Sequence, residues 1–171
     1  NLDGLVNLTT VEHYLLIVSN QALTDVNGLA NLTHVADDLE IVGNAALTNL
    51  GGLANLTEVV DDLVIDQNAA LTNVDGLANC TLLTSLDLSM DRRTWDKHGG
   101  SLNNVDGLAN CTQLTSLDLS MCKALQNVDG LTECVQLSNL EMHGIITSET
   151  LQVKPNSRLL TSREDVARYQ E

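Results

Sequence analysis

Paired carboxylates at a fixed interval are the first feature of the 171-residue chain that could do chemistry. Asp37 and Asp38 recur 24 positions later as Asp61 and Asp62. Hard oxygen ligands of this kind suit Ca²⁺. No EF-hand loop or nonapeptide calcium repeat accompanies the pairs. These four aspartates therefore support calcium-dependent adhesion only as a second alternative, and no other metal site is predicted.

The remaining polar residues do not form a catalytic pattern. His13, His34, His98 and His143 stand outside any HExxH frame, and the chain has no GxSxG, P-loop or GxGxxG motif. Serines flank the apolar segments, but no His and Asp pair is evident in the same segment to activate a hydroxyl as a nucleophile. The sequence therefore predicts a protein that is not an enzyme and that needs no cofactor.

Four cysteines could bind zinc or form disulfides. Cys80, Cys111 and Cys134 each stand four residues after a repeated glycine, at positions where leucines stand earlier in the chain. Three equivalent thiols do not pair off into disulfides, and the chain has no C-x₂-C spacing for zinc. We therefore expect these three residues, together with Cys122, to be buried thiols that pack in the core.

The balance of charge narrows the classes of partner. The chain has 23 Asp and Glu against 8 Lys and Arg, a net charge of −15, and no Lys or Arg precedes Arg92. Binding to nucleic acid needs a basic surface, so no nucleic-acid partner is expected. No run of about 18 apolar residues is present, so membrane insertion is not expected either. A hydrophobic content of 43% with 2% aromatic residues indicates a folded core of Leu, Val, Ile and Ala.

These candidate groups belong to an internal repeat. Each repeat holds two apolar residues separated by one other residue, such as Leu39 and Ile41. Because side chains alternate along a strand, both apolar side chains point to the same face. Strands stacked once per repeat would build a parallel sheet over a continuous leucine core. A glycine that precedes leucine marks each repeat, with spacings of 24, 24, 24, 31 and 23 residues, at Gly4, Gly28, Gly52, Gly76, Gly107 and Gly130.

An asparagine follows the second apolar position of the early repeats by three residues, at Asn20, Asn44 and Asn68. A coil that turns away from its strand leaves backbone donors and acceptors unpaired inside the protein. We expect a ladder of amide side chains to satisfy these groups. Asp91 and Cys122 replace the asparagine in later repeats.

The LxLxxN motif and its period resemble those of the leucine-rich repeat family. The first repeats, with an additional residue between Val35 and Leu39, are similar to receptor L-domains, and those after Gly76 resemble the cysteine-containing LxxLxLxxC type. The resemblance covers residues 1–145. It implies an α/β solenoid of six rungs, with a parallel sheet on a concave face, short turns or 3-10 segments on the convex face, and binding as the general role.

The two ends of the chain carry different expectations. Residues 146–171 are predicted to be a C-terminal cap, in which Thr161 and Glu164 fit a capping box for a short helix over 162–170. The first rung has apolar residues and no polar capping segment before it, whereas solenoids ordinarily need one. We therefore expect more protein or a second chain to stack there, which makes end-to-end self-association the first alternative function.

The residues that flank the inward-facing strand positions are predicted to form a negative concave face. Because this face has no Lys or Arg, it would favour a basic protein or peptide partner. An acidic surface that only keeps the protein soluble is the alternative. The candidate ligand-binding carboxylates are Asp38, Glu40, Asp62, Asp66, Asp87, Asp118 and Glu141.

The 31-residue spacing contains an insertion at residues 91–101 that holds Arg92, Arg93, Trp95 and His98. Insertions in solenoids form surface loops that frequently bind, and Trp and Arg are enriched in binding hot spots. We predict that the Arg92–His98 loop takes part in ligand binding. Two alternatives stay open, a loop that folds back to neutralise the acidic sheet and a loop without a role.

Five N-x-T triplets begin at Asn7, Asn31, Asn55, Asn79 and Asn110. They are glycan acceptors if a eukaryote secretes the chain. Because the triplet is part of the repeat, a structural role is favoured, in which Asn and Thr form hydrogen bonds within their own turn.

Together these features predict a non-enzymatic recognition or adhesion module that binds a protein or peptide through its acidic face and the Arg92–His98 loop. Free thiols are typical of a reducing compartment, whereas the receptor L-domain similarity favours the cell surface or a secreted protein. The localisation therefore stays open.

Overall fold

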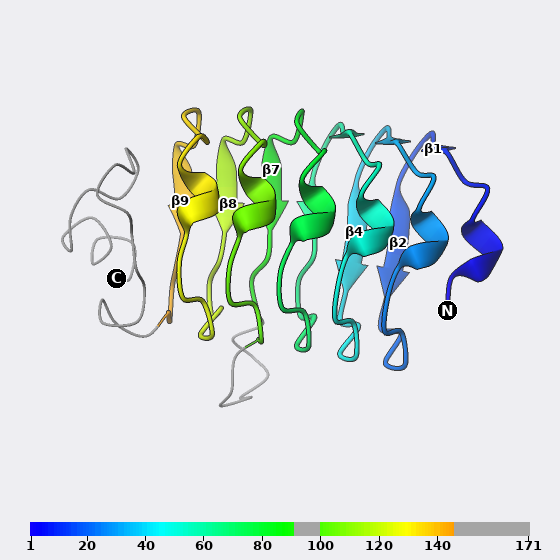
Figure 1. The fold of residues 1–171 in the computed structure, drawn as a ribbon, viewed down its shortest axis with the longest axis horizontal. Coiled ribbons are helices and arrows are strands. Elements are labelled where there is room, and N and C mark those ends of the chain that lie inside the picture. Colours follow the sequence, from blue (N-terminus) through cyan, green and yellow to red (C-terminus); the bar gives the residue numbers. More distant parts are fainter. Residues whose placement is uncertain (91–99, 146–171) are drawn as a thin grey trace.

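A computed structural model describes residues 1–90 and 100–145, which stack as six rungs in one row (Figure 1). Each rung begins with a 3-10 helix and continues into a strand of a parallel sheet on the other side of the row. This arrangement fits the predicted solenoid of the leucine-rich-repeat kind, and its described helices are all 3-10 helices. They are η1 Asp3–Leu5, η2 Asn27–Leu29, η3 Gly51–Leu53, η4 Asp75–Leu77, η5 Asp106–Leu108 and η6 Asp129–Leu131.

The six-stranded sheet has one strand from each rung, and neighbours in the sheet are neighbours in the row. All its strands pair in parallel without a shift of register, so Leu39 lies between Leu15 and Leu63. Its strands are β2 Leu15–Val18, β4 Leu39–Val42, β6 Leu63–Val64, β7 Ser85–Asp87, β8 Ser116–Asp118 and β9 Asn139–Glu141.

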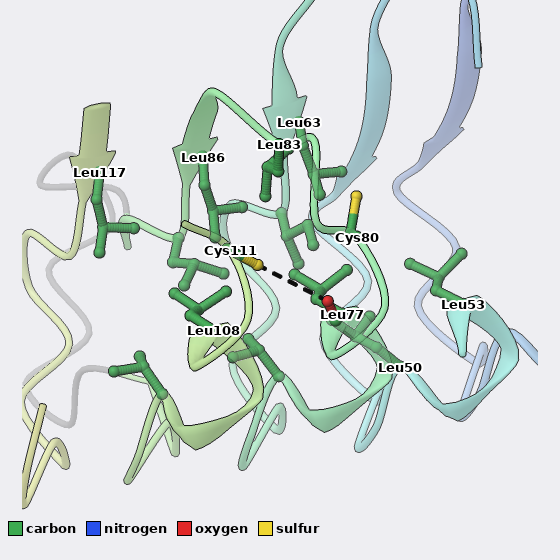
Figure 2. Close-up of a cluster of buried hydrophobic side chains, with 14 of the residues drawn as sticks. Leu50, Leu53, Leu63, Leu77, Cys80, Leu83, Leu86, Leu108, Cys111 and Leu117 are labelled. Carbon is green, nitrogen blue, oxygen red and sulfur yellow. Dashed lines mark hydrogen bonds between the residues drawn. The ribbon is translucent and has the colours of Figure 1, made fainter. Parts of the chain in front are cut away.

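The core lies between this sheet and the 3-10 helices. Alternation along each strand turns Leu39 and Ile41 inward, and both side chains are fully buried. Figure 2 shows Leu53, Leu77 and Leu108, which come from successive helices, together with strand residues in one continuous apolar interior. The aliphatic core predicted from the composition is therefore confirmed for the described residues.

A second sheet of three short strands runs beside the six-stranded sheet in the first three rungs. The strands β1 Thr10–Val11, β3 His34–Val35 and β5 Glu58–Val59 pair in parallel. These rungs have three residues between their inward Val and the next inward Leu, as from Val35 to Leu39, whereas two residues lie between Leu83 and Leu86. The additional residue is visible in the sequence, but the sheet that it allows was not predicted.

The predicted asparagine ladder is present. The amide Nδ2 of Asn68 donates to the carbonyl of Ile41 at 2.6 Å, and its Oδ1 accepts the backbone N–H of Asn44 at 3.0 Å. Asn44 repeats the pattern one rung earlier, and both side chains are buried. Cys122 occupies the same position in rung 5, where its thiol donates to the carbonyl of Leu88 at 3.2 Å.

Short polar side chains begin the 3-10 helices. The Oδ1 atom of Asn49 accepts the N–H of Gly51 at 3.0 Å, and that of Asn73 accepts the N–H of Asp75 at 3.1 Å. An Asx turn of this kind satisfies the first backbone donor and directs the chain into the helix. The same bond recurs in the rungs that contain Asp25, Asn104 and Asn127.

A column of glycines sets the close approach of the helical sides of the rungs. A Cβ atom at Gly76 would overlap the backbone carbonyl of Leu50 in the preceding rung, and Gly52 and Gly107 are in the same situation. At Gly4 the position of a Cβ atom has nothing within 4 Å. Glycine is therefore sterically required where a rung stacks on a previous one.

The N-x-T triplets have a structural role, but the prediction that they form hydrogen bonds within their own turn was wrong. Asn55 Nδ2 donates to the carbonyl of Ala30 at 2.7 Å, and Thr57 Oγ1 donates to that of Thr33 at 2.9 Å. Both acceptors lie in the preceding rung rather than in the same turn. The triplet thus joins rungs, because the turns of consecutive rungs lie in register and present each side chain to its neighbour's carbonyl.

Several predicted features lie outside the described residues. These are Arg92, Arg93, Trp95 and His98 of the insertion, and the cap over 146–171 with its helix over 162–170. Within the described residues, no helix combines the length and apolar character needed to span a membrane. In the first rung, Leu2, Leu5 and Leu8 are half-buried and pack against the core from one side.

Candidate ligand-binding face

The outward-facing residues of the six-stranded sheet form columns. Adjacent parallel strands are about 4.8 Å apart, so residues in register along the row are close neighbours. Asp87 pairs with Asp118, and Asp118 pairs with Glu141, which places three carboxylates on consecutive strands. The central column runs through Leu16, Glu40, Val64, Asp87, Asp118 and Glu141.

The part of this face over β6 to β9 is hollowed into a groove of about 230 Å³. Its acidic lining comes from Asp62, Asp87, Asp118 and Glu141, which stand on four consecutive rungs. Ser85, Ser116 and Asn139 contribute neutral polar groups. The groove therefore offers carboxylates and hydrogen-bonding groups to a ligand that lies across the strands.

Two of these carboxylates are held by the backbone. Asp87 Oδ1 accepts the N–H of Ser89 at 2.8 Å, and Asp118 Oδ1 accepts the N–H of Ser120 at 2.7 Å. Such short, charge-assisted bonds fix the side-chain rotamer. Each aspartate thus turns its second oxygen in a defined direction, and a ligand would not have to order these side chains on binding.

The described part of the chain contains little positive charge to balance this face. It holds 17 of the 23 acidic residues, and its one Lys or Arg is Lys123. The ion pairs among these residues all use histidine, as in His143–Glu141 at 3.9 Å and His34–Glu58 at 3.0 Å. The face consequently carries a negative field toward solvent when the histidines are neutral.

The other predicted carboxylates lie on or next to strands of the same sheet but outside the groove. Asp38 Oδ1 accepts the backbone N–H of Asp62 at 3.1 Å, and Asp66 Oδ2 accepts a bond from Gln67 at 2.9 Å. Glu40 stands in the central column between Leu16 and Val64. Of the seven predicted carboxylates, the groove therefore brings together four; Asp38 and Glu40 belong to rung 2, and Asp66 follows β6 in rung 3.

An apolar area on the same face was not singled out from the sequence. Tyr14, Leu16 and Val18 come from the first rung, with 64%, 50% and 45% of their surface exposed. Val18 pairs in register with Val42 on β4. The sequence contains the signal, because Leu16, Val18 and Val42 occupy outward positions of β2 and β4 and Tyr14 directly precedes β2.

The aspartate pairs considered for calcium contact other groups. Asp37 lies 3.4 Å from His13, and Asp38 accepts the backbone bond from Asp62. Within residues 1–90 and 100–145 no three His, Cys, Asp or Glu side chains are grouped so that they could hold a metal ion. Calcium-dependent adhesion therefore gains no support from the geometry of Asp37, Asp38 and Asp61.

The cysteines are buried free thiols, as predicted. Burial raises the pKa of Cys80, Cys111 and Cys122 to about 12, and that of Cys134 to about 11, from the ordinary value of 9.0. Because the thiolate is the nucleophile and the metal ligand, these residues are unreactive at neutral pH. They belong to the core, where Figure 2 shows Cys80 and Cys111 among leucines.

Comparisons with known proteins add a structural similarity that is too low to support an argument. No protein-family model matches the chain, and no curated protein matches it. Among solved structures, an internalin from Listeria monocytogenes matches over 90% of this chain and 64% of its own, with 15% sequence identity and a TM-score of 0.25. At that TM-score the similarity gives no information on a ligand.

Proposed function

We propose that the protein is a non-enzymatic recognition module of the leucine-rich-repeat kind that binds a basic protein or peptide across its six-stranded sheet. The observation that supports this proposal most is the groove over β6 to β9, in which Asp62, Asp87, Asp118 and Glu141 line consecutive rungs. A sheet that repeats in register presents such groups as a linear array, which suits an elongated ligand.

The energetics of the array favour a cationic partner. Like charges on adjacent strands repel by a few tenths of a kcal/mol for each exposed pair. A ligand that carries Lys or Arg removes this repulsion when it binds, and its association is accelerated by the negative field. Both effects weaken as salt shortens the Debye length to about 8 Å at physiological ionic strength.

Two finer assignments form part of the proposal. The early rungs are similar to receptor L-domain repeats and the late rungs to the cysteine-containing type, and a surface or adhesive role would follow from the first similarity. The Arg92–His98 loop follows β7 in the sequence, and β7 lines the groove, so we propose that Trp95 and Arg92 contribute to binding. End-to-end stacking and calcium-dependent adhesion stay predictions.

The test uses a variant that removes charge but keeps structure. Asparagine retains the Oδ1 acceptor, so Asp87→Asn with Asp118→Asn keeps both backbone bonds and loses two charges from the groove. The matched control is Asp75→Asn with Asp106→Asn, which loses the same charge from the helical side. Binding of a fluorescent lysine homopolymer is measured by anisotropy at low and physiological salt, and melting temperatures are compared.

We expect the groove variant to bind about tenfold more weakly, a loss of roughly 1.4 kcal/mol, with an unchanged melting temperature and a shallower salt dependence. The control should lose less than half of that effect. Equal losses in both variants would show that net charge alone attracts the probe, and the proposed binding face would be rejected.

A further inference from the structure

The face that carries the acidic groove has an apolar end. Tyr14, Leu16 and Val18 in rung 1 and Val42 in rung 2 form this apolar end, and the first three are about half exposed or more. Leu16, Val18 and Val42 lie on the outward side of β2 and β4 and Tyr14 directly precedes β2, whereas Ile17 and Ile41 point into the core. Strand alternation turns Leu16, Val18 and Val42 outward. Leu16 and Val18 are more exposed than Val42, because within the described residues β2 pairs with a strand on one side only.

The chemistry of the face therefore changes along the row, from apolar in the first rungs to acidic in the last. The central column starts with Leu16, passes Glu40 and Val64, and reaches the carboxylates of Asp87 and Asp118. Clustered apolar side chains rimmed by polar groups are a mark of interaction surfaces. The carboxylates at the other end of the same face favour a ligand that is cationic over rungs 4 to 6.

We propose that the ligand is a basic amphipathic helix that lies across the strands; this proposal rests on the function proposed above. One end of the helix is apolar and contacts the apolar end of the face. The other end carries one Lys or Arg per turn over Asp87, Asp118 and Glu141. The six strands span five intervals of about 4.8 Å, or roughly 24 Å. A helix covers that length with about 16 residues.

The spacing of the carboxylates favours a helix over an extended strand. Asp87 and Glu141 stand two strands apart, about 9.6 Å. Two helical turns advance about 10.8 Å, so basic residues one turn apart follow the carboxylates closely. Side chains on one face of an extended peptide are about 6.6 Å apart and advance about 13 Å over the same two steps. The flexible side chains of Lys and Arg can span the difference of about 1 Å for a helix more readily than the difference of about 3 Å for an extended peptide.

Three synthetic peptides of identical length test this assignment. The first has leucines in its first two turns and lysines at one-turn spacing in the later turns. The second has the same composition with leucines and lysines interspersed. The third is the first peptide with one central residue replaced by proline, which interrupts the helix. Each is titrated against the full chain and its variants by calorimetry at physiological salt.

The variants separate the apolar contact from the charge. Leu16→Ser removes an apolar side chain that is 50% exposed, and Leu82→Ser removes one of the same exposure in the turn before β7. Melting temperatures of both should stay close to that of the original chain because both side chains are at the surface.

We expect the first peptide to bind about tenfold more tightly than the second and the third, and Leu16→Ser to weaken the first peptide several-fold while Leu82→Ser leaves it unchanged. Equal binding of the first two peptides, or equal effects of the two variants, would overturn the apolar contact. Equal binding of the proline peptide would overturn the helix. In either case Asp87→Asn with Asp118→Asn would still weaken all three peptides if the proposed function is correct, and no effect of that variant would reject both.

Discussion

The three early rungs, which begin at η1, η2 and η3, differ from the three late rungs, which begin at η4, η5 and η6. In the early rungs the inward leucine stands four positions after the inward valine, as from Val35 to Leu39, and these rungs form the second sheet. In the late rungs the distance is three positions, as from Leu83 to Leu86, and their described residues contribute to the six-stranded sheet only. One residue per rung thus decides whether the turn forms a second ladder.

The two halves also form the buried hydrogen bond between rungs with different side chains. The buried ladder position is Asn44 and Asn68 in the early half and Cys122 in rung 5, and all three donate to a carbonyl of the preceding rung. The outward strand position changes from Leu16 to Asp118. The shared backbone shows that the rung geometry is set by leucines and glycines, which leaves the outer face able to vary in chemistry.

The largest expected loss of stability comes from a substitution at the junction of the two halves. Gly76→Ala would place a Cβ atom on the carbonyl of Leu50, and neither backbone can move without parting rungs 3 and 4. We expect a loss of at least about 3 kcal/mol in the free energy of unfolding, measured by urea denaturation.

Gly4→Ala is the matched control for this substitution. The same motif surrounds Gly4, but nothing lies within 4 Å of its Cβ position. Its effect should stay within about 0.5 kcal/mol. Similar losses at Gly4 and Gly76 would mean that glycine serves the turn itself rather than the contact between rungs.

A smaller effect tests whether the two ladder residues are equivalent. Asn68→Ala leaves the carbonyl of Ile41 and the N–H of Asn44 without their partner inside the protein, which we expect to cost about 2 to 3 kcal/mol. Asn68→Cys should cost less, because a thiol can donate to Ile41 as Cys122 does to Leu88, although sulfur is a weak acceptor for Asn44.

Asn20→Ala provides the comparison for the ladder at an exposed rung. Its Nδ2 donates to the carbonyl of Val18, two residues away, at 3.2 Å. Urea denaturation should show a loss below about 1 kcal/mol. If Asn68→Ala and Asn20→Ala were equally mild, water rather than the ladder would satisfy the buried groups.

Much of this comparison could be read from the sequence, because the features concerned repeat with the rung. The inward pair Leu39 and Ile41, the ladder at Asn44 and the column from Glu40 to Glu141 all follow from period 2 within a strand and a constant register between rungs. The position of Cys122 in the ladder followed from the same alignment.

Features that depend on contacts between rungs could not be predicted in the same way. The bond from Asn55 to Ala30 joins residues 25 apart, and a local turn explains the N-x-T pattern equally well until the rungs are placed. Likewise, the capping of Ser89 by Asp87 depends on how the chain leaves β7. The apolar end at Leu16 and Tyr14 required the exposed fractions of the side chains as well as their positions.

The smallest effect concerns the thiols that distinguish the late half. Cys80 and Leu56 occupy equivalent buried positions on either side of the junction. The pKa of Cys80 is 9.0 when exposed and about 12 in the fold. Between these values the unfolded chain loses a proton that the folded chain keeps, so unfolding is favoured as pH rises. The contribution is fully present below pH 9 and is lost toward pH 12, by up to about 1.4 kcal/mol per pH unit.

Replacing each residue by alanine therefore gives different pH profiles. Cys80→Ala should flatten the fall in the free energy of unfolding by about 1 kcal/mol between pH 9 and pH 10, because its thiol no longer titrates. Leu56→Ala lowers stability through a cavity, which carries no proton, so its profile should run parallel to that of the original chain. Parallel profiles for both variants would mean that Cys80 ionises equally in the folded and unfolded states, and burial would then not be what keeps the late-rung thiols protonated.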